Sequence, residues 1–128
     1  MYKPEDYPSI SPYLVVSDAP QLIHFLETVF HGQVTRSYPR PDGSLMHAEV
    51  KIDDSIIMLG EATTEFRPNP SMIHVYVPDV GATWKKAMEA GAKALQEPAV
   101  KDDDQDRRGG FEGPCGNSWW ISTQEVEG

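Results

Sequence analysis

The chain has 128 residues, 39% hydrophobic and 24% charged, which suits one globular domain with its own core. Its net charge of −9 argues against a nucleic-acid partner, because phosphates would be repelled, and leaves a cationic ligand possible. The single cysteine, Cys115, excludes an internal disulfide and favours a reducing compartment. No apolar run is long enough to span a bilayer and the first residues lack a signal peptide's apolar stretch, so we expect no membrane partner and a cytoplasmic location.

The expected elements begin with an extended N-terminal arm over residues 1–10. A first unit follows, with a strand, a helix and three further strands at 11–16, 18–30, 34–38, 45–52 and 56–60. Asp18 is the expected N-cap of the helix, in a capping box with Gln21, and Gly32 is the expected left-handed residue that ends it. The polar stretch 62–70 contains two prolines and is expected to link two halves.

The second half repeats the order of the first. Its strands are expected at 72–77, 93–96, 108–111 and 117–123, and its helix between Asp79 as N-cap and Gly91 as C-cap. The acidic run 102–104 is expected to be a mobile loop. The sequence therefore predicts an α+β fold in which a domain over 11–124 contains two βαβββ modules, at about 11–61 and 72–124.

Side chains alternate between the two faces of a strand, which divides the third and fifth strands into a covered and an open face. The apolar side chains expected to face a helix are Met46, Ala48, Val50, Ile52, Ile73, Val75 and Val77. The opposite faces carry Leu45, His47, Glu49, Lys51, Met72, His74 and Tyr76. One of Trp119 and Trp120 joins them from the last strand. Aromatic and polar groups on one face are typical of a concave ligand site, although each of these polar residues taken alone is more often structural.

The chain from Ser11 to Thr123 resembles the glyoxalase/bleomycin-resistance proteins of the vicinal oxygen chelate superfamily. The most specific matching segments are His47-Ala48-Glu49 with its following turn, and Asp106-Arg107 with Gly116-Asn117 and Trp119-Trp120. The resemblance implies two βαβββ modules whose curved sheets enclose a cleft, in a homodimer. Some members sequester drugs, and others are metal-dependent lyases or dioxygenases.

The resemblance also implies where a divalent metal would bind in the members that use one. By strand and turn, those four positions hold Ser11, Met58, His74 and Trp120, of which only His74 is a good ligand type. We therefore expect no metal at the usual place and no cofactor. An alternative is a two-histidine, one-carboxylate site made by His47, Glu49 and His74, which would support a metal-dependent lyase or dioxygenase.

The leading hypothesis is a protein that binds a small organic molecule, aromatic or cationic, in its cleft without a metal. The expected substrate-binding residues are His47, Glu49, His74, Tyr76, Arg107 and Trp120. An enzyme of the same fold would use His74 or His47 as acid or base, Glu49 to orient it, and Arg107 or Arg108 to receive an anionic oxygen. A structural or interaction protein without a ligand is the third hypothesis, since fold alone does not decide function.

Overall fold

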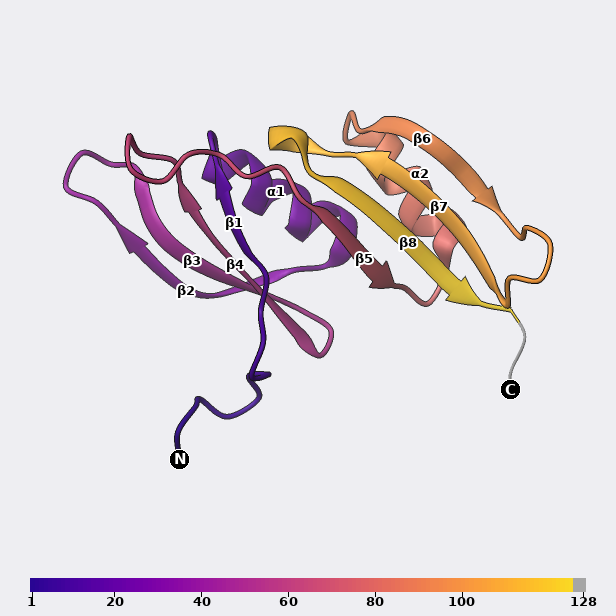
Figure 1. Ribbon diagram of the computed structural model, residues 1–128, viewed down its shortest axis with the longest axis horizontal. Helices are drawn as coiled ribbons and strands as arrows, with labels where there is room; N and C mark the ends of the chain where they lie inside the picture. Colours follow the sequence, from indigo (N-terminus) through magenta and orange to yellow (C-terminus); the bar gives the residue numbers. More distant parts are fainter. Residues whose placement is uncertain (126–128) are drawn as a thin grey trace. The chain divides into compact units, whose positions relative to one another are not determined.

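A computed structural model, which describes residues 1–125, confirms the α+β fold and its two βαβββ modules (Figure 1). The first module consists of β1 (Tyr13–Val16), α1 (Ala19–Phe30), β2 (Gln33–Pro39), β3 (Leu45–Ile52) and β4 (Ser55–Glu61). The second consists of β5 (Met72–Tyr76), α2 (Val80–Glu89), β6 (Lys93–Ala99), β7 (Asp106–Glu112), a short 3-10 helix (Pro114–Gly116) and β8 (Ser118–Gln124). The chain forms two compact units, Met1–Pro70 and Ser71–Gly128, each with one module.

The two sheets have the same strand order. It is β1-β4-β3-β2 in the first module and β5-β8-β7-β6 in the second. In each sheet the first strand of the module pairs in parallel with the last, and the other pairs are antiparallel. One helix packs against one face of each sheet and leaves the other face without a helix.

Each helix buries an apolar stripe against its own sheet. In α1, Leu22 and Leu26 are fully buried, together with Val50 and Leu59 of the sheet. In the second module Phe111 and Trp119 are fully buried on the helix side, where Phe111 meets Trp84 of α2 edge-to-face at 6.2 Å between ring centroids. These buried stripes are the ones that the helical spacing of apolar residues predicts.

The expected N-caps are confirmed, and one expected C-cap is wrong. Asp18 and Asp79 each accept a hydrogen bond at 3.1 Å from the backbone N–H three residues later. Gly91 is the left-handed residue after α2, with φ +91°. After α1, however, His31 takes the left-handed conformation (φ +56°), one residue before Gly32. Gly32 is needed for space instead, because a Cβ there would lie 2.7 Å from Val50 Cγ1.

The strand β6 is longer than expected, and Met46 of β3 is more exposed than expected. The strand β6 continues through Pro98, which an edge strand tolerates because its outer N–H groups need no partner. Met46, expected under the helix, is 51% exposed, whereas Ala48 and Val50 on the same face are fully buried.

Among residues 1–125, no helix has both the length and the apolar character needed to cross a membrane.

We predict opposite effects of alanine at two glycines. Gly32→Ala should lower the free energy of unfolding by about 1–3 kcal/mol, because its Cβ would press on the buried Val50 side chain and on the Leu26 carbonyl. Gly81→Ala, in the first turn of α2, meets only Asp79 Oδ1 at 3.5 Å and should stabilise by about 0.4–1 kcal/mol. Urea unfolding monitored by circular dichroism measures both, and equal effects would contradict the packing described for Gly32.

Candidate functional site

The parallel strand pairs set which side chains lie side by side on each open face. In the first module, Tyr13 of β1 pairs with Met58 of β4, which pairs with Glu49 of β3. In the second module the corresponding row is His74 of β5, Trp120 of β8 and Gly110 of β7. The next row there is Tyr76, Ser122 and Arg108. The register therefore brings His74, Tyr76 and Trp120 together on one face, as the alternation predicts.

The first module holds a network that we call the Glu49 cluster, formed by Tyr7, Tyr13, Arg36, His47 and Glu49. Glu49 Oε2 lies 2.7 Å from His47 Nε2, and Glu49 Oε1 accepts a 2.6 Å hydrogen bond from the Tyr7 hydroxyl. His47 Nδ1 lies 3.1 Å from the Tyr13 hydroxyl. Arg36 Nε is 3.6 Å from Glu49 Oε1, and the Glu49 side chain is only 5% exposed. The predicted pair His47 and Glu49 is thus in direct contact.

The charge state of Glu49 follows from its partners. Burial acts to raise the pKa of this carboxyl, but the hydrogen bonds from Tyr7 and His47 and the charge of Arg36 outweigh it and hold the pKa below its usual value. The pKa of the Tyr7 hydroxyl is raised, first by burial and then by its bond to Glu49. Glu49 is therefore a buried carboxylate at neutral pH.

The N-terminal arm, expected only as an extended segment, contacts its own chain through Tyr7. Besides its bond to Glu49, its hydroxyl lies 2.8 Å from Thr35 Oγ1, and the Arg36 guanidinium lies 5.3 Å from its ring centroid. Tyr2 and Ile10 of the same arm are each 87% exposed. Sequence reasoning missed this contact because a single aromatic in an irregular segment carries no periodic signal.

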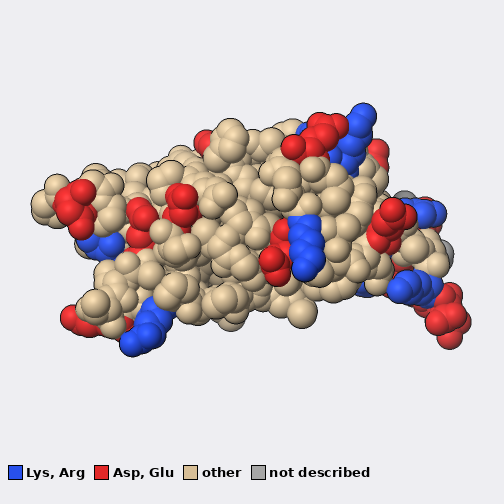
Figure 2. All heavy atoms as spheres, turned by 90° about the horizontal axis from the view of Figure 1, so that it is seen from above, with Lys and Arg blue, Asp and Glu red and all other residues tan. Residues whose placement is uncertain are grey.

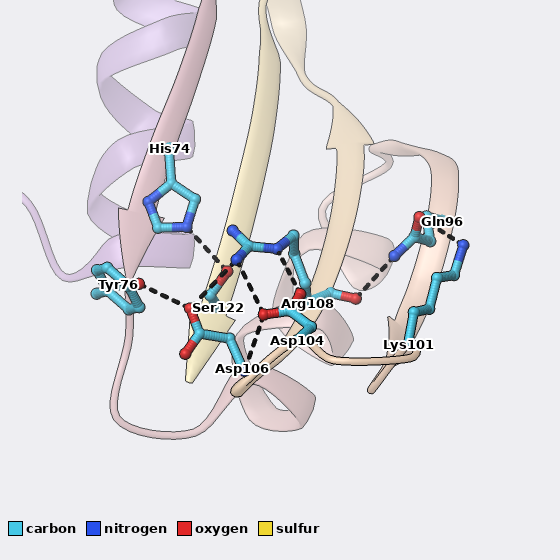
Figure 3. Close-up of polar contacts among 8 residues, drawn as sticks. All are labelled: His74, Tyr76, Gln96, Lys101, Asp104, Asp106, Arg108 and Ser122. Atoms are coloured by element: carbon cyan, nitrogen blue, oxygen red, sulfur yellow. Dashed lines mark hydrogen bonds and ion pairs between the residues drawn. The ribbon is translucent and has the colours of Figure 1, made fainter. Parts of the chain in front are cut away.

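The second module holds a different network, which we call the His74 cluster (Figure 3). His74 Nε2 lies 2.8 Å from the buried Ser122 Oγ, and the Tyr76 hydroxyl donates to Asp106 Oδ2 at 2.7 Å. Arg108 donates to Asp104 and to Asp106, each at 3.2 Å. The His74 and Tyr76 rings meet edge-to-face at 4.7 Å. Burial, and then the charge of Arg108, lowers the pKa of His74, so its imidazole is neutral at pH 7.

The two adjacent tryptophans lie on opposite faces of β8. Trp119 is fully buried beneath α2 with Phe111. Trp120 lies over Gly110, where a Cβ would come within 2.5 Å of its indole ring. The absence of a side chain at Gly110 therefore gives this indole its place on the open face.

The structure separates Arg107 from the other predicted residues of its module. Arg107 pairs with Thr123, whose hydroxyl bonds to the start of α2, so Arg107 faces the helix side, and its Nε donates to Glu125 at 2.8 Å. Arg108 faces His74 instead. Asp104, expected in a mobile loop, closes a turn with Lys101 and holds Arg108.

Charge is mixed over the face seen in Figure 2, where basic side chains lie singly among acidic ones rather than in a patch. A separate open depression of about 480 Å³ in the first unit is lined by residues 6–8 of the arm and by Lys51, Asp53 and Asp54. It contains none of the residues predicted to bind a ligand.

Comparisons with known proteins agree with this architecture. Residues 9–121 match the sequence model of the Glyoxalase/Bleomycin resistance protein/Dioxygenase superfamily. The chain belongs to this superfamily. An uncharacterized protein of Mycobacterium bovis is 33% identical over 126 residues, covering 89% of this chain and 82% of that protein.

Two solved structures share the superfamily fold with this chain. The structure of TioX from Micromonospora has a TM-score of 0.77 at 19% identity and covers 91% of this chain and 98% of its own. That of TnmS3, an antibiotic binding protein from Streptomyces, has a TM-score of 0.68 at 19% identity, covering 92% and 99%. At these identities the likeness concerns the fold.

The four positions at which the resemblance implies a divalent metal hold few suitable donor atoms. Tyr13 pairs with Met58 as His74 pairs with Trp120, so Tyr13, and not the expected Ser11, stands at the first of these positions. A thioether and an indole N–H remain poor donors for hard or borderline ions. Within either unit, the residues among 1–125 include no group of three or more His, Cys, Asp or Glu side chains placed to hold a metal. The set of His47, Glu49 and His74 draws on both units and stays a prediction.

We predict that Glu49→Gln makes stability less sensitive to acid. At pH 7 the variant should lose about 1.5–3 kcal/mol, the usual worth of hydrogen bonds to a charged group. Because the folded-state pKa of Glu49 lies below its unfolded value, its contribution is full above the unfolded pKa of about 4.3 and is lost as pH falls through the folded pKa. The difference between wild type and variant in urea unfolding should therefore shrink from pH 7 to pH 3. A constant difference would contradict an ionised Glu49.

Proposed function

We propose that the protein binds a small organic molecule, planar and cationic, on the open face of its second module, and that the Glu49 cluster of the first module is a separate polar binding surface. The observation that carries this proposal is the contrast between the faces of one sheet. One face buries Trp119, Phe111 and Ile121, whereas the other presents an indole, a phenol and an imidazole where an ordinary solvated sheet would carry lysine, threonine and glutamate. The likeness to an antibiotic binding protein supports a small organic ligand.

The charges of the His74 cluster favour a cation. Asp104 and Asp106 bring two carboxylates against the one guanidinium of Arg108, and His74 is neutral at pH 7, so one negative charge remains. Tyr76, which is 63% exposed, offers a ring face beside Asp106. A cation over an aromatic ring gains about 0.5–2 kcal/mol, more when water is excluded. The acidity of the whole chain acts in the same direction.

The proposed contacts follow from the side chains on this face of the sheet. Tyr76 and Trp120 would stack on the ligand, while His74 would exchange a hydrogen bond with it. Arg107 would take no part, because it lies on the helix side of β7. The protein would act in a reducing compartment, the cytoplasm, which its single cysteine favours.

We predict that His74→Ala weakens binding of a planar cationic dye, proflavine, by about tenfold, because the dye loses a hydrogen-bonding partner and one aromatic contact. Val75→Ala is the matched control, since Val75 is the next residue on the same strand and alternates to the helix side. It should cost about 1 kcal/mol of stability and leave binding unchanged. Fluorescence anisotropy of the dye measures binding, and urea unfolding measures stability.

An anionic planar dye, anilinonaphthalene sulfonate, tests the charge argument in the same assay. It should bind at least tenfold more weakly than proflavine, and Asp106→Asn should reduce this difference in affinity between the two dyes. Equal binding of both dyes would contradict a cation site. Normal proflavine binding by His74→Ala, together with a loss in Val75→Ala, would show that the assigned face is the wrong one.

We also propose a homodimer. Each four-stranded sheet has two edge strands, and Tyr13, Tyr38, Met72 and Leu95 on those strands are 44–75% exposed. Sedimentation velocity at micromolar concentration should show a species of twice the chain mass. A monomer at the highest concentration tested would refute this assembly.

A further inference from the structure

The Glu49 cluster connects an exposed phenol to a buried carboxylate through one imidazole. Tyr13 is 44% exposed, the His47 side chain 21% and the Glu49 side chain 5%, so exposure decreases along the hydrogen-bonded chain. Both ring nitrogens of His47 are engaged, Nδ1 with the Tyr13 hydroxyl and Nε2 with Glu49. Tyr13 is therefore the member of the chain that a molecule on the open face can reach.

The direction of the hydrogen bonds follows from the carboxylate. An ionised Glu49 has no proton to donate, so it accepts from His47 Nε2–H on one oxygen and from the Tyr7 hydroxyl on the other. A neutral His47 with its proton on Nε2 has a free lone pair on Nδ1. In that tautomer the Tyr13 hydroxyl, 3.1 Å away, donates to Nδ1.

We propose that Tyr13 is a catalytic residue that accepts a proton from the weakly acidic hydroxyl, phenol or enol, of a small molecule bound on the open face of the first module. As the ligand's O–H bond breaks, its proton goes to the Tyr13 oxygen, and the former Tyr13 proton goes to His47 Nδ1. The ligand is left as an anion and His47 as an imidazolium, whose charge Glu49 stabilises at 2.7 Å. Tyr13 passes the proton on to His47, which is the base, and Glu49 is the positioning residue.

Two further contacts hold the phenol and the imidazole for this transfer. A Cβ at Gly60 would lie 3.0 Å from the Tyr13 hydroxyl oxygen, so the glycine leaves the room that the phenol occupies. The Tyr38 ring stacks on His47 at 6.0 Å between centroids, and Tyr13 lies at 5.4 Å. The imidazole is thus flanked by two rings and bonded at both nitrogens, which fixes its orientation before any ligand arrives.

This inference adds an activity to the proposed binding function and concerns the other module. Its test needs no knowledge of the natural ligand. N-acetylimidazole acetylates tyrosine hydroxyls: the tyrosine oxygen forms a bond to the acetyl carbon, the bond from that carbon to imidazole breaks, and imidazole leaves with the tyrosine proton. A hydroxyl whose proton passes readily to a neighbouring base reacts faster.

Tyr38 is the matched reference within the same chain, because it is 46% exposed against 44% for Tyr13, and its hydroxyl makes no hydrogen bond within residues 1–125. Peptide mapping by mass spectrometry after timed exposure to N-acetylimidazole gives both rates. We expect Tyr13 to be acetylated at least tenfold faster than Tyr38 in the wild type. An equal or slower rate at Tyr13 would overturn the proposal without any variant, and it would leave dye binding at the His74 cluster untouched.

Three variants separate proton relay from simple accessibility, each assayed where circular dichroism shows it folded. Glu49→Gln still offers His47 an acceptor oxygen but no charge, and His47→Gln removes the base, so both should bring Tyr13 to the rate of Tyr38. Tyr7→Phe removes a different bond to Glu49 and leaves the relay, so Tyr13 should stay fast. Fast acetylation of Tyr13 in Glu49→Gln would refute the proposal. Equal slowing of Tyr13 acetylation by Tyr7→Phe and by Glu49→Gln would also refute it, because it would indicate that Glu49 has a structural role alone.

Discussion

The parallel pairing of the first and last strand in each module is the constraint on which both the core and the open faces depend. It sets Tyr13 beside Met58 and His74 beside Trp120. Because side chains alternate, a slip of one residue would exchange every group on one face for its neighbour on the other. Trp119 would leave the core for the surface, and Trp120 would have to fit beneath α2. The apolar helix side of each sheet thus fixes the register, and the register then fixes the chemistry of the open face.

The sequence predicted those features that depend on neighbours close along the chain. The helix starts can be predicted because Asp18 and Asp79 each accept a bond from the N–H three residues later. The face that carries His47 and Glu49 in one sheet, and His74 and Tyr76 in the other, can be predicted because alternation along a strand is a local rule. The unit repeat followed from the order of such signals. The pattern predicts Gly32 as the left-handed residue after α1, but the preceding His31 takes that conformation, because histidine tolerates it better than most side chains.

Features that depend on pairing across the chain could not be read in the same way. Tyr7 lies in an irregular arm and reaches Glu49 over 42 positions, and no periodicity records such a contact. Which of Arg107 and Arg108 lies on the open face depends on one residue of register in β7. Which of the two tryptophans lies there depends in the same way on the register of β8. The composition of the acidic run predicts a mobile loop but not its contacts, in which Asp104 accepts hydrogen bonds from Arg108 and from the Asp106 N–H.

The two modules have one backbone plan and two kinds of open face. The same row that holds Tyr13, Met58 and Glu49 in the first holds His74, Trp120 and Gly110 in the second. The helix-covered faces bury the apolar area that stabilises each unit, so they restrict both modules to similar apolar residues. The open faces contribute little to that burial and are free to differ. A buried carboxylate with its phenol and imidazole can occupy one of them, and an indole lying on a glycine the other, without altering the fold that positions them.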